Sequence, residues 1–204
     1  MCEKMAYRDG TEEIILTPHL AYAYGFDNPR EKIENLFEEF RNIVWDVGIP
    51  IKLHLGCEFL YSSKESFEKH FKDITTLADT KYLLVEFYFD VNEDVILEAV
   101  ESVLEKGCTP IIAHPERFEA FQTNTELAPR IIEMGGYLQM NKGTVYDLLD
   151  RRLIHLVGSD AHNLRNRYPA MYESFEKVKT YFGSSYAKRI FNENPEKLLN
   201  GGKV

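Results

Sequence analysis

Six side chains that can bind a metal ion stand at or just after the ends of predicted strands. In chain order they are His19, Glu58, Glu86, His114, Asp160 and His162. In a β/α barrel the carboxyl ends of all strands converge on one rim, so side chains far apart in the sequence meet in one pocket. Carboxylates gathered there raise each other's pKa, and a divalent cation relieves that repulsion. Imidazole and carboxylate ligands together suit Mn, Fe or Zn rather than Ca.

The joint pattern carries this prediction, because a single Glu or His after a strand is usually a loop residue or a helix cap. Glu86 is the strongest individual member, since it lies between Val85 and Phe87. A carboxylate in so apolar a run needs a cation or several hydrogen bonds. Asp160 and His162 place two ligands on one turn. If a hydrolysis takes place at this metal site, we also expect one of these two residues to assist its leaving group by proton transfer.

Two arginines are candidates for binding a phosphoryl group beside the metal. Arg117 follows His114 closely in the sequence, and Arg167 follows His162. A guanidinium matches the geometry of phosphate with paired donors and holds the oxygens that the metal leaves uncovered. Both arginines are therefore candidate phosphate clamps, and if the site hydrolyses a phosphomonoester, Arg117 is expected to stabilise charge in the transition state. For Arg167 a surface ion pair explains the spacing equally well.

An aromatic segment follows His19. Tyr22, Tyr24 and Phe26 lie close together in this predicted loop. They are expected either to form a wall at the mouth of the pocket, suited to an aryl ring of a substrate, or to fasten the loop to the body of the protein. The sequence favours neither alternative.

The other histidines, the cysteines and the tryptophan are interpreted as structural. His54 and His155 lie within predicted strands, where we expect packed or hydrogen-bonded rings, whereas His70 is expected on the surface of a charged helix. Trp45 lies beside the apolar stripe of a helix and is predicted to pack. The cysteines have no identifiable base or ligand partner: Cys2, Cys57 and Cys108.

Short apolar runs alternate with helical patterns along the whole chain, which predicts an α/β protein with a mostly parallel sheet. Six runs indicate strands: 14–16, 51–55, 82–85, 109–113, 137–140 and 153–157. The first long helix is expected to start with Asn28 as its N-cap and Pro29 at its first position. Six strands suit either a barrel-like β/α repeat or an open doubly wound sheet. No glycine-rich nucleotide-binding motif follows any strand, which weakens the nucleotide-binding versions of the open sheet.

The composition fits a single domain over residues 1–204 and argues against several classes of protein. The chain is 44% hydrophobic and 28% charged, which excludes a disordered or low-complexity protein. Its net charge of −9 disfavours nucleic-acid binding. No apolar run approaches the ~20 residues that span a bilayer, and the first residues lack a secretory apolar core. The odd, sparse cysteines argue against a disulfide scaffold, so we expect a cytoplasmic location.

Five motifs occur in order along nearly the whole chain: Thr17-Pro18-His19, Gly56-Cys57-Glu58, Leu84-Val85-Glu86-Phe87, Ala113-His114-Pro115-Glu116-Arg117 and Gly158-Ser159-Asp160-Ala161-His162-Asn163. Together they resemble the bacterial PHP-type (polymerase and histidinol phosphatase) protein-tyrosine phosphatases of capsule and exopolysaccharide operons. The resemblance implies a distorted TIM-like (β/α)7 barrel, a manganese cluster of up to three ions, and a tyrosine-phosphorylated bacterial tyrosine autokinase as substrate. It also implies that the six strand-end residues are metal ligands and that Arg117 and Arg167 bind phosphate.

The sequence departs from the family pattern in two places. The family's first strand carries His-x-His, which supplies two further ligands, and that motif does not occur here. We therefore expect six strands in place of seven and fewer than three metal ions. Open sheet edges then favour a homo-oligomer or a strand supplied by a partner. The stretch from Asn141 to Asp160 is also shorter than in the family, with its helix trimmed to about residues 144–151.

Two other functions stay open at this point. One is a phosphatase for small molecules such as histidinol phosphate. The other is a catalytically weak phosphotyrosine-binding or regulatory module that keeps the pocket without the His-x-His ligands. Comparing turnover of a phosphotyrosyl peptide and histidinol phosphate separates the two enzymes. Phosphopeptide binding without manganese-stimulated phosphate release identifies the module.

Overall fold

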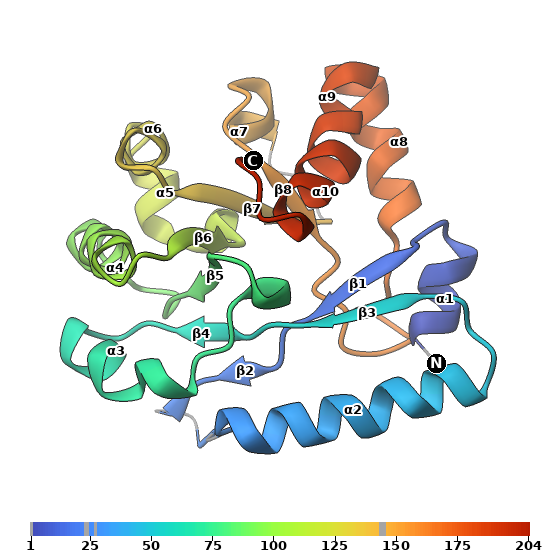
Figure 1. Cartoon of the computed structure of the whole chain (residues 1–204). Helices are drawn as coiled ribbons and strands as arrows, with labels where there is room; N and C mark the ends of the chain where they lie inside the picture. Colours follow the sequence, from blue (N-terminus) through green and yellow to red (C-terminus); the bar gives the residue numbers. More distant parts are fainter. Residues whose placement is uncertain (1, 23–24, 27, 143–145) are drawn as a thin grey trace.

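The computed structural model describes residues 2–22, 25–26, 28–142 and 146–204 of the 204-residue chain. Within this part of the chain, strand segments form two parallel sheets (Figure 1). The larger sheet has the order β2-β4-β5-β6-β7-β8, and β1 pairs with β3 in the smaller one. The strands are β1 (Glu13–Leu16), β2 (His19–Leu20), β3 (Lys52–Leu55), β4 (Glu58–Leu60), β5 (Tyr82–Glu86), β6 (Thr109–Ala113), β7 (Tyr137–Asn141) and β8 (Leu156–Gly158).

Helices connect the strands, and those between β4 and β8 lie around the outside of the larger sheet (Figure 1). The last helix packs on the other face of this sheet through Leu198. The α-helices are α1 (Cys2–Arg8), α2 (Arg30–Asp46), α3 (Lys64–His70), α4 (Glu93–Glu105), α5 (Glu119–Thr123), α6 (Leu127–Met134), α7 (Tyr146–Asp150), α8 (Met171–Phe182), α9 (Ser184–Lys188) and α10 (Asn194–Leu199). Shorter turns are η2 (Phe71–Asp73), η3 (Leu77–Asp79), η4 (Pro115–Arg117) and η5 (Arg189–Glu193). The alternation of strand and helix predicted from the sequence is therefore confirmed. Of the helix predicted near residues 144–151, positions 144 and 145 lie outside the described residues.

The first two predicted strands are each followed by a second, short strand that the sequence did not predict, and these second strands carry two of the site residues. The chain leaves β1 at Pro18, which cannot donate a hydrogen bond to a ladder. It leaves β3 at Gly56, where an added Cβ would lie 2.7 Å from a side-chain carbon of Leu77 and 3.3 Å from its Cα. After each break the chain enters the larger sheet, where β2 begins at His19 and β4 begins at Glu58.

The last predicted strand is shorter than expected, because its first residues lie in the irregular segment that follows α7. The backbone N–H of Leu153 donates to the carbonyl of Leu148, which closes the helix. The strand β8 therefore starts at Leu156, and the prediction that His155 lies in a strand is wrong.

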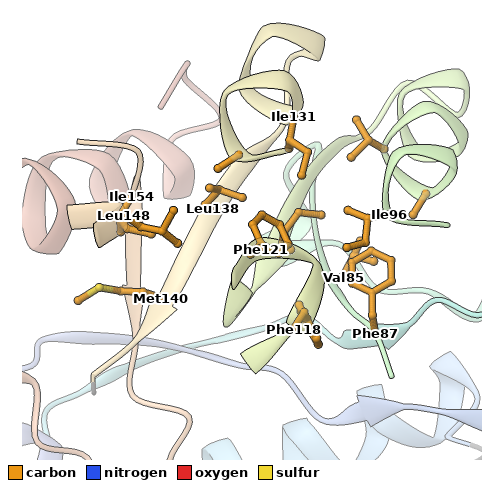
Figure 2. Close-up of a cluster of buried hydrophobic side chains, with 14 of the residues drawn as sticks. Val85, Phe87, Ile96, Phe118, Phe121, Ile131, Leu138, Met140, Leu148 and Ile154 are labelled. Atoms are coloured by element: carbon orange, nitrogen blue, oxygen red, sulfur yellow. The ribbon is translucent and has the colours of Figure 1, made fainter. Parts of the chain in front are cut away.

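Alternate side chains of the central strands enter two different cores. Leu83 and Val85 of β5 pack outward against α4 and its neighbours in the main core. Figure 2 shows this core, with Val85 facing Ile96 of α4 and with side chains of β7 and α6 beside them. Tyr82 and Leu84 lie in a second cluster on the other face of the sheet. Glu86 continues that second set, because strand side chains repeat every two residues.

The long helix α2 is covered on one side only. It contacts a third, small core shared with α1, β1 and β3, in which Val44 is its one buried residue. Trp45, predicted to pack, is 80% exposed, so that prediction is wrong. The small core cannot cover a stripe that runs the length of a 17-residue helix. Among the described residues, no helix has the length and apolar character needed to cross a bilayer.

Candidate active site

Four of the predicted ligands come together where β2 and β4 begin and where β5 and β6 end. The register of the parallel sheet sets their positions, since His19 pairs with Glu58 across β2 and β4. Glu58 is also the partner of Leu84, two residues before Glu86, so both glutamates point to the same face of the sheet. His114 follows β6 directly and completes the group.

The side chains of these four residues are within contact distance of one another. His19 Nε2 lies 3.5 Å from Glu58 Oε2 and 3.7 Å from Glu86 Oε1. His114 Nε2 lies 3.1 Å from Glu58 Oε1 and 3.3 Å from Glu86 Oε2. Ligand atoms of His19, Glu58 and Glu86 all lie within 4.8 Å of one another, a spacing that one metal ion can span. The residues present therefore fit a divalent cation, which suits two imidazoles and two carboxylates.

The pKa of His114 reflects the two carboxylates beside it. Its side chain is only 6% exposed, and burial alone would lower the pKa of its imidazole. Hydrogen bonds to Glu58 and Glu86 outweigh burial and raise this pKa to about 9. Its backbone has a φ of +33°, a conformation that costs a non-glycine residue energy and is concentrated at functional sites. A cation is thus favoured between the two carboxylates, and an imidazolium supplies it.

In the metal-free protein, raising the pH from about 6.5 through 9 is expected to destabilise the fold. Because the pKa of His114 is near 9 in the folded state and near 6.5 when unfolded, the folded state binds the additional proton in this interval. The stabilisation is complete below about pH 6.5 and is lost as the pH rises through 9, by on the order of 3 kcal/mol. Denaturant unfolding in a chelator across this range measures the loss. A His114→Gln variant should show a flatter dependence, and identical profiles would contradict the assignment.

Arg117, Arg167 and Asp160 form the second half of the site. Both guanidiniums place an Nη2 atom 2.5 Å from the same oxygen, Oδ2 of Asp160. Burial works to raise the pKa of Asp160, but the hydrogen bond from Arg167 and the charges of both arginines outweigh it and hold the pKa below its usual range. The backbone of Asp160 is also left-handed, with φ +47°. The surface ion pair considered for Arg167 is therefore a contact inside the site.

Asn141 belongs to this half of the site, and the sequence analysis missed it. Its Nδ2 donates to Oδ2 of Asp160 at 2.9 Å, and its backbone N–H donates to Oε1 of Glu116 at 3.1 Å. Asn141 ends β7 at the same rim and is 8% exposed. Its position at a strand end was the available signal, but an amide was not counted among metal-binding side chains.

His162 lies between the two halves. Its ring centroid is 5.6 Å from that of His19, and its Nδ1 lies 3.4 Å from Oδ1 of Asp160. The loop that carries it is held by Asn163, whose Oδ1 accepts hydrogen bonds from three backbone N–H groups, including that of Arg167. The structure thus brings all six predicted ligands and both arginines to one rim, with Asp160 committed to the arginines rather than to the four-residue cluster.

The aromatic segment after His19 divides between the two predicted roles. Tyr22 fastens the loop: its hydroxyl donates to Asp73 at 3.0 Å and its ring stacks on His70 at 3.6 Å. Phe26 is 54% exposed, with its ring 6.1 Å from that of His19, at the mouth of the site. Tyr24 lies outside the described residues.

Asn28 has a different role from the one predicted. Pro29 occupies the N-cap position of α2, and no side chain caps this helix. Asn28 instead donates from Nδ2 to the backbone carbonyl of His19 at 3.0 Å. This hydrogen bond ties the chain just before α2 to β2, the strand that carries His19.

The histidines interpreted as structural behave largely as expected. Nε2 of His54 lies 2.7 Å from Glu13 Oε2, and Nδ1 of His155 accepts a hydrogen bond from the backbone of Leu138. Burial lowers the pKa of His155 to about 4, and the charge of Arg189 adds to the effect. The ring of His70 is stacked rather than simply exposed.

Comparison with known proteins gives a consistent picture. A family model described as "Capsular polysaccharide synthesis, CpsB/CapC" matches residues 1–200. Tyrosine-protein phosphatase CpsB of Streptococcus pneumoniae is 33% identical over 213 residues, which cover 95% of this chain and 86% of the relative. Tyrosine-protein phosphatase YwqE of Bacillus subtilis (strain 168) is 28% identical over 213 residues, 98% of this chain and 83% of the relative.

The fold is also that of a solved structure. A crystal structure from work on YwqE of Bacillus subtilis and CpsB of Streptococcus pneumoniae, described as unique metal-dependent tyrosine phosphatases, aligns with a TM-score of 0.90 at 27% identity. The alignment covers all of this chain and 86% of that one. This confirms the α/β fold predicted from the sequence, here with six parallel strands in the larger sheet.

Proposed function

Because the chain belongs to the capsular polysaccharide synthesis CpsB/CapC family, we propose that it is a metal-dependent tyrosine-protein phosphatase. The observation that supports this function best is the pairing of two unlike clusters at one rim of the sheet. One cluster contains two imidazoles and two carboxylates. The other contains two guanidiniums on a single carboxylate oxygen. The first suits a divalent cation and the second a phosphoryl group.

The metal is proposed to bind to His19, Glu58, Glu86 and His114, with Asp160 and His162 completing the ligand set. Manganese fits a set rich in carboxylates, and iron and zinc are the alternatives. A bound divalent cation supplies Lewis acidity toward phosphoryl oxygens and makes hydroxide available at neutral pH. Because a metal ligand must be a neutral imidazole, His114 would have to give up its proton for a cation to bind.

Arg117 and Arg167 are proposed to bind the phosphoryl oxygens of the substrate. In the absence of substrate both neutralise Asp160. A phosphate monoester offers three oxygens to the same donors and matches the planar fork of a guanidinium better than one carboxylate oxygen does. Charge that develops on these oxygens in the transition state then meets donors that are already in place.

Asp160 and His162 are proposed to assist the leaving group by transferring a proton to it. The phenolate of tyrosine has a parent pKa of about 10, so it leaves with little assistance. His162 Nδ1 lies 3.1 Å from the backbone carbonyl oxygen of Asp160 and 3.4 Å from its Oδ1, so the imidazole is held beside the carboxylate, where it can deliver a proton. Phe26 is proposed to contact the departing aromatic ring at the mouth of the site.

The protein substrate is proposed to be a tyrosine-phosphorylated bacterial tyrosine kinase of capsule synthesis. The test compares manganese-dependent phosphate release from a phosphotyrosyl peptide and from histidinol phosphate. Faster turnover of the peptide, lost in EDTA and restored by manganese, supports the proposal. Faster turnover of histidinol phosphate identifies a small-molecule phosphatase instead. Peptide binding without phosphate release identifies a regulatory module and overturns the enzymatic function.

Treatment with iodoacetamide is expected to leave turnover unchanged, because no cysteine lies in the proposed mechanism. Cys57 is the cysteine nearest the site in sequence, and it is 4% exposed. Burial raises the pKa of its thiol to about 12, so the reactive thiolate is scarce at neutral pH. The measurement is residual activity after alkylation, with the number of labelled cysteines counted by mass spectrometry. Inactivation that follows labelling of Cys57 would point to a cysteine nucleophile.

A further inference from the structure

A cavity of about 450 Å³ lies at the corner where α8 runs into α9, at the top edge of Figure 1. Two arginines, two serines and two aromatic rings line it: Arg152, Arg189, Ser184, Ser185, Phe182 and Tyr186. Arg152 precedes β8, whereas Asp160 follows β8, so the cavity is at the opposite end of this strand from the metal cluster. Its volume is within the range of small-molecule sites.

Both arginines are positioned by the same tyrosine. The guanidinium carbon of Arg152 lies 4.4 Å from the centre of the Tyr186 ring, and that of Arg189 lies 4.9 Å from it. Tyr186 itself is fixed, since it is 5% exposed and its hydroxyl donates to the carbonyl of Ile154 at 3.1 Å. Stacking on an aromatic face holds the plane of a guanidinium and leaves its N–H edge free for a ligand.

The charge of this pair is not balanced within the described part of the chain. Arg117 and Arg167 contact Asp160, whereas neither Arg152 nor Arg189 has a carboxylate at ion-pair distance there. The protein as a whole carries a net charge of −9, so two neighbouring cations without a carboxylate run against its overall composition.

The backbone conformation of Arg152 is a separate indication that this residue belongs to a binding site. Arg152 lies two residues after α7 with φ +59°, the left-handed position that glycine usually occupies just past a helix end. An arginine is strained there, and strain of this kind is concentrated at binding and catalytic sites.

From these observations we propose that the cavity between Arg152 and Arg189 is a second anion site, which binds a phosphate monoester group away from the catalytic centre. The two guanidiniums hold adjacent oxygens of the phosphate, and the hydroxyls of Ser184 and Ser185 add donors at the rim. The site does not depend on hydrolysis and stands whether or not the catalytic function proposed above is correct.

The test uses titration calorimetry with inorganic phosphate on a protein carrying Arg117→Ala and Arg167→Ala, which removes the arginines of the catalytic site. One binding event is expected to remain. Arg189→Ala or Arg152→Gly should weaken it about tenfold or more, since each removes a charged hydrogen-bond donor. Arg130→Ala is the matched control, because Arg130 is exposed on α6 and is not among the residues that line this cavity; it should have no effect.

Arg152→Gly separates binding from structure. Glycine relieves the left-handed backbone, so the melting temperature should stay the same or rise while phosphate binding falls. Hydrolysis of p-nitrophenyl phosphate by the otherwise unchanged enzyme should not alter. If the double variant fails to fold, amide shifts of Ser184 and Ser185 in the wild-type protein report the same binding by NMR. No phosphate binding, or binding that Arg152→Gly leaves intact, overturns the proposal.

Further titrations identify the source of the phosphate group. Adenosine monophosphate represents a free small molecule, and a phosphotyrosyl peptide represents a modified protein. The ligand that binds at least tenfold more tightly than inorganic phosphate, and loses that advantage in Arg152→Gly, is the class that the site takes. Equal affinity for all three assigns the site to inorganic phosphate itself.

Discussion

Replacing Glu86 by glutamine is expected to reduce kcat roughly a thousandfold or more, because the loss of metal chemistry removes several kcal/mol of transition-state stabilisation. Glu86 contacts both His19 and His114, so it joins the two sides of the proposed metal cluster. Glutamine keeps the shape of the side chain but removes the negative charge that a divalent cation requires. The same substitution replaces a charged hydrogen-bond acceptor, which raises the pKa of His114, by a neutral one, so this pKa should fall. The measurements are steady-state turnover in manganese and metal content after dialysis.

Glu13→Gln is the matched control for this prediction. Glu13 also contacts a histidine, since its Oε2 lies 2.7 Å from Nε2 of His54, but the pair joins β1 to β3 in the smaller sheet. The control removes a Glu–His contact of similar geometry and should leave turnover and metal content unchanged. If Glu86→Gln keeps its full metal content and at least a tenth of its turnover, the cluster is not the catalytic metal site.

The meeting of the four proposed metal ligands could be predicted because it follows from strand order. In a parallel sheet every strand ends at the same edge, so a polar residue after an apolar run is placed without knowledge of the loops. Glu86 is the clearest case, since it ends β5 as predicted. His19 and Glu58 were placed at the correct rim although each belongs to a second strand segment that the sequence did not separate. That separation depends on the contact between Gly56 and Leu77, which are far apart in the sequence.

The partners of the arginines could not be predicted, because they depend on how loops close. Arg117 follows β6 and Arg167 follows β8, yet both reach one oxygen of Asp160. That meeting requires the turn held by Asn163, in which Asn163 Oδ1 accepts three backbone hydrogen bonds. A sequence pattern gives the residue types of such a turn but not the direction in which it projects a side chain. The prediction for Trp45 was wrong for a similar reason, because helical periodicity indicates an apolar stripe but not what covers it.

The two clusters have complementary requirements, and this links the fold to the chemistry. Glu58 and Glu86 are held close together and need a cation, which the imidazolium of His114 provides in the metal-free chain. Asp160 is neutralised by arginines instead, and so keeps its negative charge without the metal. A phosphate dianion is attracted to both clusters, since it competes with Asp160 for the guanidiniums and bears oxygens suited to a divalent cation. Product phosphate should therefore be a competitive inhibitor.

Arg167→Ala is expected to lower kcat/KM for p-nitrophenyl phosphate by roughly 10- to 100-fold, the equivalent of one charged hydrogen bond. Its Nη2 lies 2.5 Å from Oδ2 of Asp160, and its hydrogen bond is the largest of the effects that lower the pKa of that carboxyl group. The pKa of Asp160 should therefore rise in the variant. A lowered carboxyl pKa stabilises the fold above the unfolded pKa of about 4, and this stabilisation is lost as the pH falls through the folded pKa. Removing Arg167 should thus lower stability at neutral pH and reduce its dependence on pH in the acid range.

Three comparisons separate phosphate binding from a general effect of charge. Arg167→Lys keeps the charge but not the planar fork, so it should recover only part of the lost kcat/KM. Arg30→Ala removes an exposed arginine that pairs with Glu34 on α2, and it should change neither kcat/KM nor inhibition by phosphate. The inhibition constant for phosphate should increase in Arg167→Ala in parallel with the loss of kcat/KM, because substrate and product share the same donors. An unchanged inhibition constant would mean that Arg167 acts only by holding Asp160 in place.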